Sequence, residues 1–177
     1  MKRKVIFFTG FSLLVVLIGL PLALKQNWGQ FSNGGKQRYI LTDTLRKSTI
    51  FNEQDSLLLQ KLIADSARIL FRFPPNTCHC LEPDFAEAVK RAKNKIGENK
   101  IFVIIAAADA KDIHFFCERT KLSSPVYGTN DTLLASFDAN ETPYACVVFP
   151  DMTARNIVTI DSTNIDELIS YAKKVIP

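Results

Sequence analysis

Residues 67–80 read Ala67-Arg-Ile-Leu-Phe-Arg-Phe73-Pro-Pro-Asn-Thr-Cys78-His-Cys80. The part up to Phe73 is rich in strand formers, and the two prolines that follow cannot continue a β-ladder. Beyond the cysteines, Pro83 is tolerated only in the first turn of a helix. Four apolar residues then recur at helical spacing: Phe85, Ala88, Val89 and Ala92. The sequence therefore predicts a strand over 67–73 and a helix that begins near Cys80, with the cysteine pair between them.

Strand and helix patterns alternate again after residue 100. The segment Ile101-Phe-Val-Ile-Ile-Ala106 is a continuous apolar run, typical of a strand that is covered on both faces in a parallel sheet. Asp109 is expected to cap the helix that follows it. Residues 142–149 and 156–160 have the pattern of a β-hairpin around a turn at Pro150. The chain closes with a helix that we expect Thr163-Asn164 to cap.

Two further segments have weaker patterns. An Asn52 cap followed by acidic residues and a leucine-rich run indicates a short helix over 52–63. Residues 121–140 contain turn-forming residues, and we expect two short strands there, near 125–127 and 133–137.

The order of these elements predicts the fold class. Strands that alternate with helices are joined by right-handed crossovers and pair in parallel, whereas the short turn at Pro150 requires an antiparallel pair. We therefore predict an α/β fold in which a mixed sheet is flanked by helices on both faces.

The N-terminal segment has the properties of a membrane anchor. Residues 5–24 carry no charge, and a helix of about 20 residues crosses a hydrocarbon core. A cleaved signal peptide has a shorter apolar region and small residues at its cleavage site, which Pro21-Leu-Ala-Leu-Lys25 fits poorly, although cleavage stays open. With the basic residues 2–4 inside, the rest of the chain is exported. We predict a single transmembrane helix within 1–25 in the inner (cytoplasmic) membrane, and a domain facing the periplasm or exterior.

The net charge of +4 belongs to the anchor region. Four of the 22 Lys and Arg residues flank the apolar segment, which leaves 18 basic residues against 18 acidic ones in the rest of the chain. Nucleic-acid binding needs a concentrated positive surface, so no nucleic-acid partner is expected. Residues 26–50 begin as a polar, Gly-containing stretch and are predicted to form a tether, followed by a folded domain over 51–177.

Export changes how the four cysteines are interpreted, because disulfides persist outside the cytoplasm. Cys78, Cys80, Cys117 and Cys146 allow three complete pairings, and the sequence does not choose among them. Cys117 falls on the apolar side of its predicted helix, and Cys146 falls within a predicted strand. We expect both to be small buried hydrophobic residues.

A strand, a cysteine pair at the start of the next helix, and a Thr142-Pro143 step before a later strand together resemble the thioredoxin fold. The resemblance covers roughly residues 67–176. It implies that Cys78 and Cys80 are the redox pair, at a helix N-terminus that favours a thiolate. It also implies that Thr142 and Pro143 form a loop with a cis proline that holds the substrate chain.

The motif departs from that of the family, in which two residues separate the cysteines, often after a tryptophan. Here His79 alone separates them, and Asn76-Thr77 precedes them. A Cys-x-Cys disulfide closes a smaller and more strained ring, so the pair is expected to oxidise or shuffle other disulfides more readily than reduce them. His79 adds a partial positive charge that stabilises a thiolate. Either Cys78 or Cys80 can be the attacking residue.

The anchor, the expected export and the long connection between Phe116 and Pro143 look like the membrane-tethered branch of thiol-disulfide oxidoreductases. This resemblance implies thiol–disulfide exchange on envelope proteins, with protein thiols or disulfides as partners and no cofactor. The client protein, the direction of electron flow and the oligomeric state stay open.

Three alternatives also stay open. A thioredoxin-like domain without redox chemistry would only bind partners. Pro74, Thr77 and Cys80 resemble the peroxiredoxin motif Pro-x-x-x-Thr-x-x-Cys, one residue short, with Arg119 as the candidate guide for peroxide. The Cys78-His-Cys80 run has the soft ligand types of copper-delivery proteins of the same fold, but adjacent residues rarely all reach one ion, so no resident metal is expected.

Overall fold

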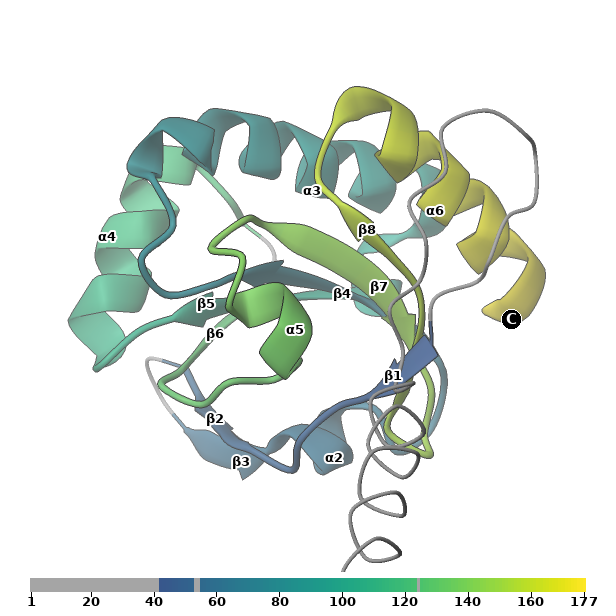
Figure 1. Ribbon diagram of the computed structural model, residues 1–177, viewed down its shortest axis with the longest axis horizontal. Coiled ribbons are helices and arrows are strands. Elements are labelled where there is room, and N and C mark those ends of the chain that lie inside the picture. Colours follow the sequence, from purple (N-terminus) through teal and green to yellow (C-terminus); the bar gives the residue numbers. More distant parts are fainter. Residues whose placement is uncertain (1–41, 53–54, 124) are drawn as a thin grey trace, which may run out of the picture. The chain divides into compact units, whose positions relative to one another are not determined.

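The strand that leads to the cysteines lies inside a mixed sheet, shown in the computed structural model of Figure 1. The structure describes residues 42–52, 55–123 and 125–177. Its strands are β1 (Thr42–Thr44), β2 (Thr49–Phe51), β3 (Ser56–Leu58), β4 (Arg68–Phe73), β5 (Ile101–Ala106), β6 (Val126–Thr129), β7 (Tyr144–Val148) and β8 (Thr153–Thr159). Its helices are α2 (Leu59–Leu62), α3 (Glu82–Ile96), α4 (Ala110–Thr120), α5 (Ala135–Asp138) and α6 (Ser162–Val175), with 3-10 turns η1 (His79–Leu81) and η2 (Glu98–Lys100).

The sheet topology confirms the predicted α/β class. The strands of the described residues pair in the order β1-β8-β7-β4-β5-β6-β2-β3. β4 is parallel to β5 and β5 to β6, with α3 and α4 as the crossovers, whereas β7 is antiparallel to both β4 and β8. The predicted parallel first half and antiparallel hairpin are therefore both present.

An apolar core lies on each face of the sheet, because the side chains of β4 alternate between them. On one face, Ile69, Phe71 and Phe73 share a core with apolar residues of α3, α4 and α6. On the other face, Leu70 shares a core with Leu59 of α2 and with Leu134, which precedes α5. Figure 1 shows α3 and α6 along one side of the sheet and α2 on the opposite side.

Two local predictions are wrong. Residues 133–137 do not form a strand, because the Asp138 carboxylate accepts the Leu133 N–H at 2.7 Å and the Asp138 N–H bonds to the Leu134 carbonyl at 2.8 Å, which closes the short helix α5. The last helix is capped by Asp161 rather than by Thr163-Asn164, since its Oδ1 accepts the Asn164 N–H at 2.8 Å.

The helix predicted over 52–63 is reduced to α2 at its end. Asn52 Oδ1 accepts the Asp55 N–H at 2.7 Å, which makes a turn instead of a helix start. The residues after this turn form β3, which pairs with β2, so only Leu59–Leu62 is helical.

The sheet begins before the predicted domain boundary at residue 51. β1 pairs with β8 and β2 pairs with β6, so residues 42–50, the last part of the tether predicted over 26–50, lie in the same sheet as the predicted domain. The predicted anchor over 5–24 and the first part of the tether lie outside the described residues. Within the described ranges, none of the helices combines the length and the apolar character that crossing a membrane requires.

One charged residue of β4 is fully buried. Arg72 donates from Nε to Asp138 Oδ1 at 3.3 Å and from Nη2 to the Asp131 carbonyl at 3.1 Å. The Tyr144 hydroxyl donates to the same Asp138 oxygen at 3.1 Å. Burial, together with the Asp138 charge, raises the pKa of Tyr144, so its phenol stays protonated and donates this bond. The network ties α5 and the first residue of β7 to the middle of the sheet.

Replacing Asp138 tests this network. Because Asp138→Ala leaves the Arg72 charge buried without its partner, the variant should lose about 3–5 kcal/mol of unfolding free energy in urea titrations. Asp166→Ala is the control, since Asp166 pairs with Lys95 at 3.0 Å on the surface and its removal should have a far smaller effect. Equal losses in the two variants would contradict the role given to the buried pair.

Candidate functional site

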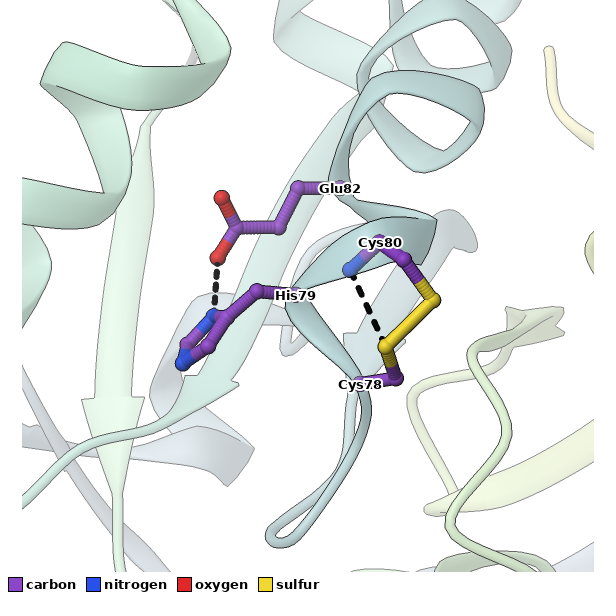
Figure 2. Close-up of a disulfide and its surroundings, with 4 residues drawn as sticks. All are labelled: Cys78, His79, Cys80 and Glu82. Carbon is purple, nitrogen blue, oxygen red and sulfur yellow. Dashed lines mark hydrogen bonds and ion pairs between the residues drawn. A yellow bond between two sulfur atoms is a disulfide. The ribbon is translucent and has the colours of Figure 1, made fainter.

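Cys78 and Cys80 form a disulfide at the junction of β4 and α3, with their Cα atoms 5.2 Å apart (Figure 2). Both residues are exposed. The Cys80 N–H donates to Cys78 Sγ at 3.2 Å, and the Leu81 N–H donates to the Cys78 carbonyl at 3.0 Å, which closes η1. The position of the pair between strand and helix is the one predicted from the sequence.

The loop before the disulfide is fixed by local bonds. Pro74 ends β4, and its carbonyl accepts the buried Thr77 hydroxyl at 2.9 Å. Asn76 has a φ of 60°, in the left-handed region that Asn tolerates better than most residues. The chain thus leaves the sheet in a tight turn that presents the cysteines to solvent.

The disulfide lies just before the N-terminus of α3, a helix of 15 residues. The unpaired N–H groups of a helix start carry a partial positive charge, which favours a negative sulfur nearby. Glu82 and Asp84 lie in the same first turn. An uncompensated carboxylate there would oppose a thiolate, so the partners of Glu82 matter for the chemistry of the pair.

The Glu82 carboxylate is bound by the side chains of Arg119 and His79. Arg119 of α4 donates from Nε to Glu82 Oε2 and from Nη2 to Glu82 Oε1, both at 2.8 Å. His79 Nδ1 lies 2.6 Å from Oε1, and the His79 side chain is 77% exposed whereas that of Glu82 is 6% exposed. The Arg119 hydrogen bond, helped by His79 and opposed by burial, holds the pKa of the Glu82 carboxyl below its usual value.

The contacts of Glu82 determine which His79 nitrogen carries the proton and how the Glu82 charge is balanced. An ionised Glu82 only accepts hydrogen bonds, so His79 Nδ1 carries the proton in their contact. The Glu82 charge is offset by Arg119, whose own pKa is raised by the same pair. In Figure 2, His79 and Glu82 extend to one side of the turn, and the disulfide extends to the other.

The Thr142-Pro143 step lies at the same end of the sheet. Tyr144, the next residue, pairs with Arg72 of β4, so Pro143 enters the sheet beside the end of β4 that leads to the cysteines. Pro143 is buried, and its carbonyl accepts the Ile160 N–H at 3.0 Å. The cis peptide implied by the resemblance is not found: all peptide bonds of the described ranges are trans, the lower-energy isomer even before proline.

A pocket of about 480 Å³ lies beside the disulfide, and the sequence did not reveal it. The loop from Phe73 to Thr77 and His79, the end of β5 and the first residues after it, and α4 line this pocket. Neither cysteine lines it, whereas His79, which stands between them in the sequence, does. Glu82 and Asn130 also line it, so its walls come from four separate segments of the chain, which no local pattern brings together.

The other two cysteines lie on β7 and α4. Cys146 is completely buried in β7, as expected, and burial raises the pKa of its thiol. Cys117 is half-buried on α4. Neither side chain takes part in the disulfide.

The residues of the peroxiredoxin interpretation have partners within the protein. The Thr77 hydroxyl is used by the Pro74 carbonyl, and Arg119 is used by Glu82, so the groups of the peroxiredoxin interpretation have other partners. Within the part of the chain that the structure describes, no three His, Cys, Asp or Glu side chains are grouped closely enough to hold a metal ion.

The chain matches no family model and no curated protein sequence. Solved structures resemble it in fold. BsSco, a member of the Sco family of cytochrome c oxidase assembly proteins, has a TM-score of 0.57 at 14% identity, over 77% of this chain and 95% of that one. Peroxidoxin BcpB from Mycobacterium tuberculosis has a TM-score of 0.55 at 12% identity, over 77% and 98%. A candidate thiol:disulfide interchange protein, DsbE from Chlorobium tepidum, has a TM-score of 0.55 at 10% identity, over 75% and 96%.

These similarities show that the fold is thioredoxin-like. Identities this low show the fold alone, and the function of a chain depends on the residues of its own site.

Proposed function

We propose that the domain carries out thiol–disulfide exchange with other proteins through Cys78 and Cys80. The observation that supports this most is an exposed disulfide directly before the N-terminus of α3 in a thioredoxin-like fold. Exposure allows a client sulfur to approach, and the helix N-terminus stabilises the thiolate that exchange requires.

The reaction has two balanced steps. A client thiolate attacks one sulfur of the pair, the Cys78–Cys80 bond breaks, and a mixed disulfide forms while the other cysteine leaves as a thiolate. A second client thiolate then attacks the client sulfur of the mixed disulfide, so the client leaves oxidised and the pair is reduced. The reverse sequence reduces a client disulfide. No further oxidant or reductant is needed within either half of the exchange.

The surroundings favour Cys78 as the residue that holds the negative charge. Its sulfur already accepts the Cys80 N–H, and this bond becomes charge-assisted and stronger when the sulfur is a thiolate. Arg119 offsets the charge of Glu82, which would otherwise oppose this thiolate.

We also propose that the domain acts outside the cytoplasm, tethered to the inner membrane by residues 5–24. The support is the uncharged segment of 20 residues after the basic residues 2–4. In that compartment the clients are envelope proteins whose thiols form lasting disulfides.

Reactivity of the reduced chain tests the proposed chemistry. Thiols at helix N-termini have pKa values lowered from about 8.5 to roughly 3.5–7.5, so an alkylating reagent at pH about 6 should label Cys78 or Cys80 before the other cysteines. Cys78→Ser or Cys80→Ser should abolish the fast phase without unfolding the domain, because both side chains are exposed. Mass spectrometry of timed samples measures each site.

The matched control is Cys146→Ala, which removes a buried thiol of raised pKa and should leave the fast phase intact. If all cysteines react at one slow rate that rises only above about pH 8, the value of an ordinary thiol, the pair is not a redox centre. The domain would then be the non-catalytic binding module of the same fold.

Fractionation tests the proposed location. The full chain should stay with membranes after carbonate washing, and a reporter that is active only outside the cytoplasm should be active when fused after Pro177. Release of the chain into the soluble fraction would show that the N-terminal segment does not anchor it.

A further inference from the structure

The pocket beside the disulfide has an apolar floor. Phe73, Ile105, Ala107 and Phe116 line it, and all four are buried members of the core under α3 and α4. Its volume of about 480 Å³ lies within the range of roughly 300–1,000 Å³ found for ligand sites. The small side chains of Ala106, Ala107 and Ala108, at and just after the end of β5, leave this space open.

An exposed aromatic residue forms part of the rim. Phe115 lines the pocket from α4 and is 53% exposed, and the other large hydrophobic side chain exposed among the described residues is Leu58, at 50%, on β3. Covering an exposed aromatic ring removes apolar surface from water and is favourable. The rim therefore gains from a partner that contributes apolar atoms.

The charges of the pocket are satisfied within the protein. Its titratable lining groups are His79, Glu82, Asp112 and Arg119. Glu82 and Arg119 form a two-bond pair, and His79 Nδ1 is held by Glu82. Asp112 Oδ2 accepts the Ala108 N–H at 2.7 Å as part of the cap of α4. Each of these charged groups already has a partner within the protein, and an uncharged apolar guest would leave those bonds intact.

The pocket lies beside the turn that carries the disulfide, although neither cysteine lines it. The loop from Pro74 to Thr77 forms one wall, and the same loop runs directly into Cys78. His79, which lines the pocket, lies between the two cysteines in the sequence. An extended chain advances by roughly 3.3 Å per residue, so a segment whose sulfur is at the disulfide can place a side chain a few residues away in the pocket.

We propose that this pocket binds an uncharged apolar side chain, aliphatic or aromatic, that lies near the reacting cysteine of the client, and that Phe115 is its main specificity residue. The inference rests on the proposed exchange reaction and adds the client feature that the domain recognises. It places recognition on the α4 side of the disulfide, apart from the Thr142-Pro143 loop.

Exchange kinetics with short cysteine peptides test the proposal on the purified full chain. The peptides carry Phe, Leu, Lys or Glu at one to three residues from the cysteine. Dithiothreitol is the control reagent, because it reduces the disulfide but has no side chain that could occupy the pocket. For at least one spacing, the second-order rate constant for reduction of the Cys78–Cys80 disulfide should be about tenfold higher for Phe or Leu than for Lys or Glu. Phe115→Ala should remove most of this preference and leave the dithiothreitol rate unchanged.

Two further variants make the result specific. Ala108→Phe fills the pocket from its exposed wall and should lower the rate with the apolar peptides about as much as Phe115→Ala. Leu58→Ala removes an equally exposed apolar side chain elsewhere and should change nothing. Circular dichroism confirms that each variant is folded.

The outcomes distinguish failure of the recognition pocket from failure of the exchange reaction. If peptides of all four kinds react equally while dithiothreitol reacts normally, the exchange reaction stands and the recognition pocket is refuted. A Phe115→Ala variant that slows dithiothreitol and all peptides alike also refutes it, since the residue would then act on the disulfide itself. If neither peptides nor dithiothreitol react with the wild-type chain, the exchange reaction fails, and this inference fails with it.

Discussion

The ion pair between Arg72 and Asp138 is the constraint on which the arrangement around the disulfide depends. Arg72 is fully buried in the strand between β5 and β7, and a charge in such a position is stable only with a bonded partner. Asp138 supplies it from 66 positions further along the chain and also accepts the Tyr144 hydroxyl. Arg72 is two residues before Pro74, and Tyr144 is one residue after Pro143. The network therefore fixes the strand ends next to the loop that begins at Pro74 and the loop that ends at Pro143.

On this fixed frame, the disulfide is accessible and its surroundings are ordered. Exchange needs a sulfur that another protein can reach and an environment that tolerates negative charge. The exposed Cys78–Cys80 pair meets the first need. The start of α3 and the Cys80 N–H provide an environment that tolerates negative charge, as long as the charge of the nearby Glu82 is neutralised. Arg119 neutralises it through two hydrogen bonds of 2.8 Å. The position of the disulfide in the thioredoxin-like fold and the neutralised Glu82 carboxylate therefore both favour thiol–disulfide exchange.

The parts of the fold that local patterns determine could be predicted from the sequence. The apolar run of β5, the Asp109 cap of α4 and the prolines after β4 each act over a few residues, and all three were found where expected. Parts that depend on distant partners were missed. Residues 133–137 have strand-like composition, but Asp138, fixed by Arg72, draws them into a helical turn. Glu82 and Arg119 are 37 positions apart, so neither their pairing nor the pocket beside them could be predicted from local patterns.

Redox equilibration of the purified chain tests the central claim most directly. The chain is held in thiol–disulfide buffers of stepwise potential, and the thiols of each cysteine are counted by alkylation and mass spectrometry. A working pair predicts that Cys78 and Cys80 become reduced together in one two-electron transition, in which about 30 mV changes the ratio of the two forms tenfold, while Cys146 stays a thiol throughout. Two cysteines that titrate independently of each other, or a disulfide that persists in the most reducing buffer, would contradict the account.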